Sequence, residues 1–121
     1  MSDIERIEPD PRRSRAVVYN GMVFIGGQTC DDRTQDIKGQ TRQALAKSER
    51  FLASAKTDKS RLISAQIWVA DIERDVAGMN EVWDAWTAAG SAPTRATAEV
   101  KFASRDLLVE IMVVAVASPA P

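Results

Sequence analysis

Residues 107–117 of this 121-residue chain read LLVEIMVVAVA, and this stretch says more about the fold than any other. Apolar side chains occupy both its odd and its even positions, which predicts a β-strand that is buried on both faces. In a small two-layer domain, helices cover only one face of a sheet. We therefore expect the other face to pack against a second copy of the chain, because a large bare apolar face would aggregate.

Glu110 interrupts this apolar strand. An ionised carboxylate in such a place costs several kcal/mol unless it is paired or hydrogen-bonded. Residues 95–100 predict the preceding strand, and the short polar turn between the two runs predicts an antiparallel hairpin. In that register Arg95 pairs with residues 110–113 and lies close to Glu110. The pair could hold a substrate carboxylate and a water molecule, or it could be a plain salt bridge. A bulge could also turn Glu110 to solvent, and the spacing leaves these alternatives open.

The rest of the chain predicts a hairpin, one further strand and two helices. Residues 16–28, AVVYNGMVFIGGQ, predict the hairpin because two β-rich apolar runs flank Asn-Gly. Residues 37–55 have a 3.6-residue apolar period and follow Asp36, a typical helix N-cap. A strand is predicted for residues 62–69 and a second helix for residues 76–89. The order β-β-α-β-α-β-β predicts an α+β fold with both helices on one face of a single mixed sheet.

The length of the chain fits a single domain over residues 1–121, with residues 1–12 as a loose leader and residues 118–121 as a fraying tail. No secretory segment and no membrane-spanning stretch is visible. The one cysteine, Cys30, cannot form an internal disulfide, which fits a reducing compartment. We therefore expect a cytoplasmic protein. Cys30 also has no basic neighbour to activate it as a nucleophile.

Charge and composition narrow the function. The 16 basic and 17 acidic residues nearly balance, whereas nucleic-acid binders usually carry a basic surplus. The short cluster of Arg12, Arg13 and Arg15 is therefore expected to be a solvated entry to the first strand or an oligomer contact. The chain has no histidine, which excludes a Ser-His-Asp triad and a histidine-based ribonuclease and argues against a typical zinc site.

Four segments, in order, resemble the Rid (YjgF-like) family of reactive-intermediate deaminases. NGMVFIGGQ resembles the second-strand motif of that family, and GMNEVWDAW resembles its second helix. APTRATAEV resembles its Pro-x-Arg strand, and LLVEIMVVAVA resembles its closing strand. The resemblance runs from about residue 13 to residue 117.

The resemblance implies a chorismate-mutase-like fold and a homotrimer with three clefts between its subunits. Well-studied members hydrolyse enamines and imines, such as 2-aminoacrylate, to 2-oxo acids and ammonia without a cofactor or a metal. A small 2-imino or 2-oxo acid is thus the implied ligand. The alternative is a non-catalytic trimer that binds small carboxylates or has a regulatory role. Endoribonuclease activity or translation inhibition, labels given to relatives, is disfavoured by the lack of histidine.

The resemblance also implies roles for five residues. Arg95 corresponds to the arginine that clamps the substrate carboxylate, and Glu110 to the glutamate that positions or activates water. Asn80 corresponds to a helix asparagine near the cleft. Thr97 takes the place of a residue whose backbone contacts the ligand, and Gly27 lies where the second strand reaches the pocket.

Two positions depart from the family pattern. Many members have a tyrosine where this chain has Arg13, and a serine is common where it has Gly26. Both changes alter the wall of the implied pocket, so we expect a substrate other than 2-aminoacrylate. Arg13 could add a positive charge that favours a dicarboxylate or a larger acid, or it could be an ordinary surface arginine.

Overall fold

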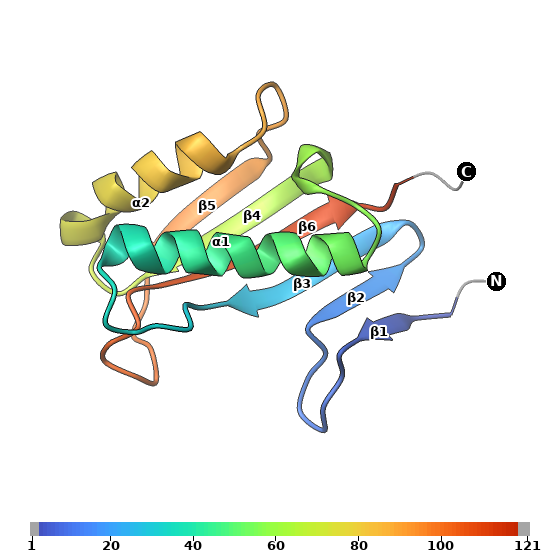
Figure 1. Ribbon diagram of the computed structural model, residues 1–121, viewed down its shortest axis with the longest axis horizontal. Coiled ribbons are helices and arrows are strands. Elements are labelled where there is room, and N and C mark those ends of the chain that lie inside the picture. The colour runs from blue at the N-terminus through green and yellow to red at the C-terminus, as the bar shows by residue number, and fades with distance from the viewer. Residues whose placement is uncertain (1–2, 119–121) are drawn as a thin grey trace.

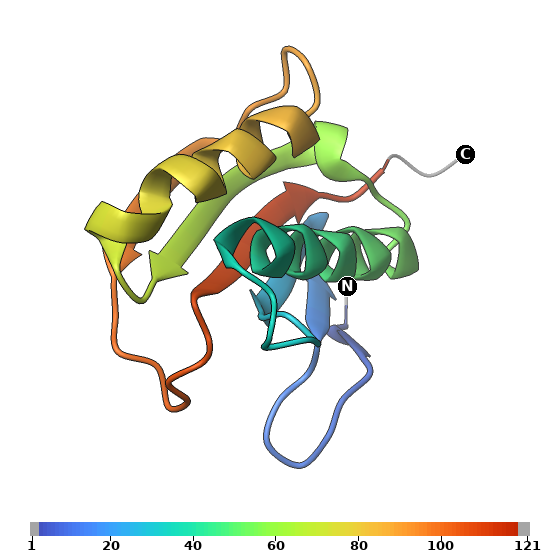
Figure 2. The ribbon, with the colours of Figure 1, turned by 60° about the vertical axis from the view of Figure 1, so that its left-hand side comes forward.

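The computed structural model describes residues 3–118, in which a six-stranded sheet is covered on one face by two helices (Figure 1). The second view shows both helices on the same side of the sheet (Figure 2). Within this part of the chain, neither helix has the length and apolar character needed to cross a membrane. In chain order, the elements are β1 (Glu5–Ile7), β2 (Ala16–Tyr19), β3 (Met22–Gln28), α1 (Ile37–Ser54), the short 3-10 helix η1 (Lys59–Arg61), β4 (Leu62–Val69), α2 (Ile72–Trp86), β5 (Thr94–Glu99) and β6 (Val109–Val116).

The sheet has the strand order β1-β2-β3-β6-β4-β5. β6 lies between β3 and β4 and is antiparallel to both, while β5 is parallel to β4 at the edge. The predicted hairpin of the two last strands is therefore wrong. β6 is apolar on both faces and gains the most from a central place, whereas nearly every residue of β5 is exposed, as suits an edge strand.

The true pairing also separates Arg95 from Glu110. Arg95 lies opposite Ala65 of β4, and Glu110 lies opposite Trp68, so that β4 stands between their strands. Directly paired residues point to the same face, and successive residues alternate. Ala65 is buried under the helices, and Trp68 is on the other face. Arg95 and Glu110 therefore point to opposite faces of the sheet within one chain, and the expectation that they are neighbours is wrong.

β6 marks the two faces of the sheet most clearly. Its odd-numbered residues, from Val109 to Ala115, are at most 1% exposed and form the core with the helices. Its even-numbered residues, from Glu110 to Val116, remain partly exposed on the open face. Phe24 of β3 lies beside Val114 there and is 45% exposed. An apolar open face is thus present, and the second copy that would cover it stays a prediction.

The predicted hairpin at the start of the sheet is confirmed. β2 and β3 pair antiparallel, with Tyr19 opposite Met22. The two residues between them, Asn20 and Gly21, have φ angles of 50° and 76°. Positive φ at both central positions is typical of the type I′ turn, which Asn-Gly favours.

Side-chain caps set the start of each helix. Asp36 caps α1 and accepts a hydrogen bond from the Gly39 N–H, so this predicted start is confirmed. α2 starts at Ile72 instead of residue 76, because Asp71 caps it through the Arg74 N–H. After Ile72, the next three residues of α2 are charged, so the apolar period does not show where the helix starts.

The N-terminal segment is not a loose leader. Residues 5–7 form the edge strand β1 and pair antiparallel with β2. The loop that follows, residues 8–15, folds back so that the Arg15 N–H donates to the Ile7 carbonyl. The prediction for residues 1–12 is therefore wrong over this segment, whose alternation is too short to see in sequence. Of the predicted tail, residues 119–121 lie outside the described residues.

Candidate active site

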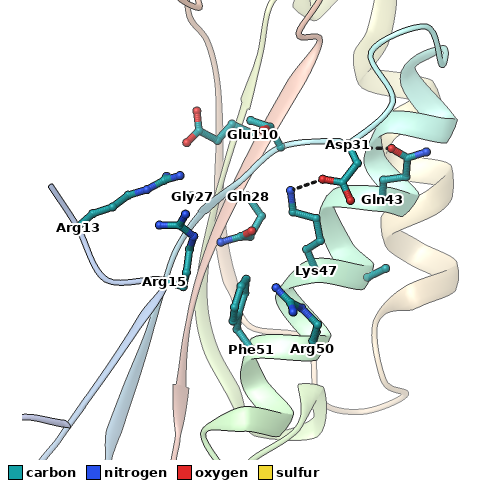
Figure 3. A pocket seen from close by; sticks show the side chains of 12 residues that line it. Arg13, Arg15, Gly27, Gln28, Asp31, Gln43, Lys47, Arg50, Phe51 and Glu110 are labelled. Atoms are coloured by element: carbon teal, nitrogen blue, oxygen red, sulfur yellow. Dashed lines mark hydrogen bonds and ion pairs between the residues drawn. The ribbon is translucent and has the colours of Figure 1, made fainter. Parts of the chain in front are cut away.

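A pocket of about 640 Å³ opens where β3 ends, between loop 8–15 and α1 (Figure 3). β2 is short, so the sheet leaves this corner uncovered beside the last residues of β3. The lining side chains are mostly polar or charged. They come from Arg13, Arg15, Gly27, Gln28, Thr29, Asp31, Gln43, Ala46, Lys47, Arg50, Phe51 and Glu110. The pocket therefore brings together three of the predicted site residues, Arg13, Gly27 and Glu110.

Gly27 makes room for the Glu110 side chain. The pairing of β3 with β6 shifts register between Ile25 and Gln28, which places Gly27 in an irregular stretch next to Glu110. A methyl group on Gly27 would lie 2.9 Å from the carboxyl carbon of Glu110, too close for two carbon atoms. The glutamate thus lies directly over the glycine, and only a residue without a side chain allows this.

The Glu110 carboxylate and the Arg13 guanidinium face the pocket without ion pairs. Neither side chain forms an ion pair or a side-chain hydrogen bond anywhere in residues 3–118. Figure 3 shows Arg13 pointing toward Glu110 across Gly27. Glu110 is the one charged residue of β6, and it lies on the partly exposed face of the strand at the pocket. An acid in such a place, open to a pocket, is a candidate for chemistry on a bound ligand.

Asp10 holds the loop that carries Arg13. One Asp10 oxygen accepts hydrogen bonds from the N–H groups of Arg12, at 2.7 Å, and Arg13, at 2.9 Å. The other accepts a hydrogen bond from the Arg15 guanidinium at 3.0 Å. These donors, the Arg12 and Arg13 N–H groups first, lower the pKa of Asp10 from 3.8 to about 2. At neutral pH, ionised Asp10 therefore fixes the backbone of the loop from which these arginine side chains extend.

The cations on the α1 side of the pocket have partners of their own. Lys47 pairs with Asp31 at 3.0 Å. The Arg50 guanidinium stacks on the ring of Phe51, 4.4 Å from its centre, and Glu8 approaches it at 4.0 Å. Gln43 lies one turn before Lys47 and accepts hydrogen bonds from the N–H groups of residues 31 and 32. This side of the pocket is thus a polar wall of ordered side chains.

Arg95, Thr97 and Asn80 form a second group, away from this pocket. The Arg95 guanidinium lies 5.7 Å from the centre of the Trp83 ring of α2, on the helix-covered side of the sheet. Asn80 is on the same helix, and Thr97 points to the same face as Arg95. Across residues 3–118, Asn80 Oδ1 and Thr97 Oγ1 are the buried side-chain atoms with no hydrogen-bond partner. Two groups that both belong to the predicted site are therefore apart in a single chain.

Sequence reasoning overlooked several residues of the pocket. Gln43, Lys47 and Arg50 are not among the site residues predicted from the sequence. They lie at i, i+4 and i+7 of α1, so they share one side of the helix beside its buried stripe. That spacing is visible in the sequence. The loop that brings Arg15 to them is not, because it depends on the pairing of β1 with β2.

Two other kinds of site have no support among the described residues. No three of their His, Cys, Asp or Glu side chains are grouped so that they could hold a metal ion. Cys30 is 6% exposed, and burial raises the pKa of its thiol. A buried thiol with a raised pKa is a poor nucleophile.

Comparison with known proteins assigns the chain to a family. The family model described as Endoribonuclease L-PSP matches residues 4–117. A solved member of the YjgF protein family from Neisseria meningitidis is 39% identical, has a TM-score of 0.93 and matches over 98% of each chain. The chain belongs to the YjgF, or Rid, family. This confirms the predicted family and the α+β fold class.

Other Rid relatives agree. A RutC family protein from Haemophilus ducreyi is 38% identical over 112 residues, which are 93% of this chain and 95% of that protein. A solved structure from Yersinia pestis, described as a protein of unknown function of the Rid family, is 26% identical with a TM-score of 0.86. It matches 95% of this chain and 100% of that chain. The Rid fold therefore extends over almost the whole sequence.

Proposed function

We propose that this Rid-family protein is a hydrolase that converts 2-imino acids and their enamine tautomers to 2-oxo acids and ammonia. One observation carries the proposal. The Glu110 carboxylate, on an otherwise apolar strand, lies over Gly27 and faces a cation-rich pocket without an ion pair. Glu110 is the one charged residue of β6, and a reaction that needs a carboxylate beside a bound ligand explains its place there.

The reaction asks little of the protein. An enamine first takes a proton on carbon and becomes the iminium. Water then adds to the iminium carbon, and Glu110 accepts the proton that the water loses as the new C–O bond forms. The proton passes to the nitrogen and the C–N bond breaks. As ammonia leaves, the new hydroxyl group loses its proton to Glu110 and becomes the carbonyl of the 2-oxo acid. Orientation of the substrate and one general base are enough, so the reaction as proposed uses no cofactor.

Arg95 is the proposed clamp for the carboxylate next to the reacting carbon, and it must come from a neighbouring copy. Within one chain, Arg95 and Glu110 point to opposite faces of the sheet. In the proposed cytoplasmic homotrimer, Arg95, Asn80 and Thr97 of one subunit complete the pocket of the next. The partnerless oxygens of Asn80 and Thr97 support this arrangement, since a ligand or a neighbour at that edge would satisfy them.

Ammonia release tests the proposal. An amino acid oxidase generates 2-imino acids in solution, and the decay of the imine is followed with and without the protein. We expect the wild-type protein to accelerate the decay and Arg95→Ala to lose about 100-fold in kcat/KM, because a bidentate clamp fixes the substrate. Arg105→Ala, an exposed arginine in the loop before β6, is the matched control. Unchanged ammonia release by Arg95→Ala would show that the clamp is assigned to the wrong residue.

A carboxylate-binding protein without catalysis is the second candidate. It is favoured by the fact that the pocket of one chain contains Glu110 and several cations but not Arg95. Such a protein would be stabilised by 2-oxo acids in a thermal-shift measurement and would not accelerate imine decay. Turnover therefore separates the two candidates. The ribonuclease named in the family description has no histidine to use in this chain.

A further inference from the structure

We propose that the pocket selects 2-imino acids that carry a second carboxylate, the imines of acidic amino acids, and that Arg13 binds this distal carboxylate. The inference rests on the proposed function and names its substrate class. Three features carry it: the charge of the lining side chains, the freedom of Arg13 and the size of the pocket.

The charges of the pocket wall favour a ligand with net negative charge. Four lining side chains are cationic, those of Arg13, Arg15, Lys47 and Arg50, and two are carboxylates, those of Asp31 and Glu110. The iminium form of a monocarboxylic substrate is a zwitterion with no net charge. The corresponding diacid carries one net negative charge. Because Asp10 pairs with Arg15 and Glu8 approaches Arg50, the lining cation left to attract this charge among the described residues is Arg13.

Arg13 is the cation of this wall with no ion pair of its own among the described residues. Arg15 is held by Asp10 and Lys47 by Asp31, each at 3.0 Å. Arg13 is exposed and points across Gly27 toward the Glu110 carboxylate (Figure 3). Its guanidinium can grip a carboxylate with two parallel hydrogen bonds.

The loop makes Arg13 a positioned group. Its N–H donates to Asp10, and its carbonyl accepts a hydrogen bond from the Asp10 N–H at 2.7 Å. A distal carboxylate bound to Arg13 would thus lie at a fixed place relative to Glu110.

The pocket has room for a substrate longer than three carbons. Its volume of about 640 Å³ lies in the range of pockets for much larger ligands. It extends from Glu110 to Lys47 and Arg50 on α1, so polar groups line it beyond the reacting position. A substrate side chain with a carboxylate can interact with these polar groups, whereas a small apolar side chain cannot.

Two substrates of equal length provide the test. The imines of glutamate and of 2-aminopentanoate both have five carbons, and they differ in the distal carboxylate. We expect wild-type kcat/KM to be at least about ten-fold higher for the diacid, and Arg13→Gln to lower it at least about ten-fold more for the diacid than for the monoacid. Arg12→Gln is the matched control, because Arg12 is the neighbouring residue and does not line the pocket. It should retain the wild-type preference.

The outcomes separate the inference from the proposed function. Imine turnover without a preference for the diacid, or an equal loss for both substrates in Arg13→Gln, would overturn the inference and leave the hydrolase in place. If neither imine is turned over, the proposed function fails, and a binding measurement then tests the inference about Arg13. Calorimetry should then give 2-oxoglutarate at least about ten-fold tighter than 2-oxopentanoate, with the difference lost in Arg13→Gln. Equal affinities, or no binding of either acid, would overturn the inference.

Discussion

At the scale of single residues, the site depends on a contact between a glycine and a glutamate. Gly27 and Glu110 lie on neighbouring strands at a shift of register, and the carboxylate occupies the space that a side chain at position 27 would fill. The glycine motif was visible in the sequence, but its reason was not. Paired glycines at a strand end also fit a simple bulge, and only the pairing of β3 with β6 shows that Glu110 is what lies above Gly27.

Gly27→Ala should therefore lower the activity more than the stability of the protein. The added methyl group displaces the Glu110 side chain, and we expect kcat/KM for 2-imino acids to fall about 100-fold. The free energy of unfolding should fall by less than about 1 kcal/mol, because the Glu110 carboxylate is the end of a flexible, partly exposed side chain and can move aside. A double-mutant cycle with Glu110→Ala is the control, because the stability cost should shrink once no carboxylate lies over residue 27. An unchanged cost in that background would mean that the two residues do not interact.

At the scale of elements, loop 8–15 positions two arginines that line the pocket, Arg13 and Arg15. It is held by Asp10, whose carboxylate binds the Arg12 and Arg13 N–H groups and the Arg15 side chain. A group whose pKa is lowered in the folded protein stabilises it above the unfolded pKa, and this contribution disappears as the pH falls through the folded pKa. For Asp10, this stabilisation is lost as the pH falls from about 4 to about 2.

Asp10→Asn should thus change the pH dependence of stability. We expect the melting temperature of the wild-type protein to exceed that of the variant above about pH 4, and the difference to shrink as the pH falls toward 2. Differential scanning fluorimetry across this range measures it. Asp3→Asn, which removes an exposed carboxylate outside the loop, is the matched control. A difference between wild type and Asp10→Asn that stays constant with pH would contradict the role given to the Asp10 charge.

The elements also show what sequence reasoning could reach. Local signals were reliable: the Asn20-Gly21 turn and the Asp36 cap are each fixed by the chemistry of a few adjacent residues. The place of β6 was not, because strands that follow one another often pair, and nothing local shows that β6 inserts between β3 and β4. Glu110 and Arg95 were singled out from residue type and resemblance. Their placement on opposite faces depends on that long-range pairing.

At the scale of the whole molecule, the proposed active site needs more than one copy of the chain. Two features point there independently. The open face of the sheet is apolar, with Phe24 45% exposed, and Arg95 cannot share a face with Glu110 inside one chain. A homotrimer with sites between subunits would cover the open face of the sheet and bring Arg95 of one subunit to Glu110 of the next. Oligomeric state and catalysis should then be inseparable.

Mixed oligomers test this directly. Arg95→Ala and Glu110→Gln chains, each inactive alone, are produced together with different affinity tags so that mixed oligomers can be isolated. If one chain supplies Arg95 and the next supplies Glu110, every trimer that contains both variants restores both residues in one of its three sites. We therefore expect the isolated mixed trimers to show about a third of the wild-type rate. No recovery in oligomers that contain both tags would place the two residues in one chain or in separate sites.

The role of Glu110 as the general base is the central claim, and Glu110→Gln tests it most directly. The substitution keeps the size of the side chain and removes its ability to take a proton. We predict that kcat for 2-imino acid hydrolysis falls at least about 100-fold. The affinity for the product 2-oxo acid, measured by calorimetry, should change by less than about three-fold, because Arg95 and not Glu110 holds the carboxylate. A variant that retains kcat within about three-fold of the wild-type value would contradict the account.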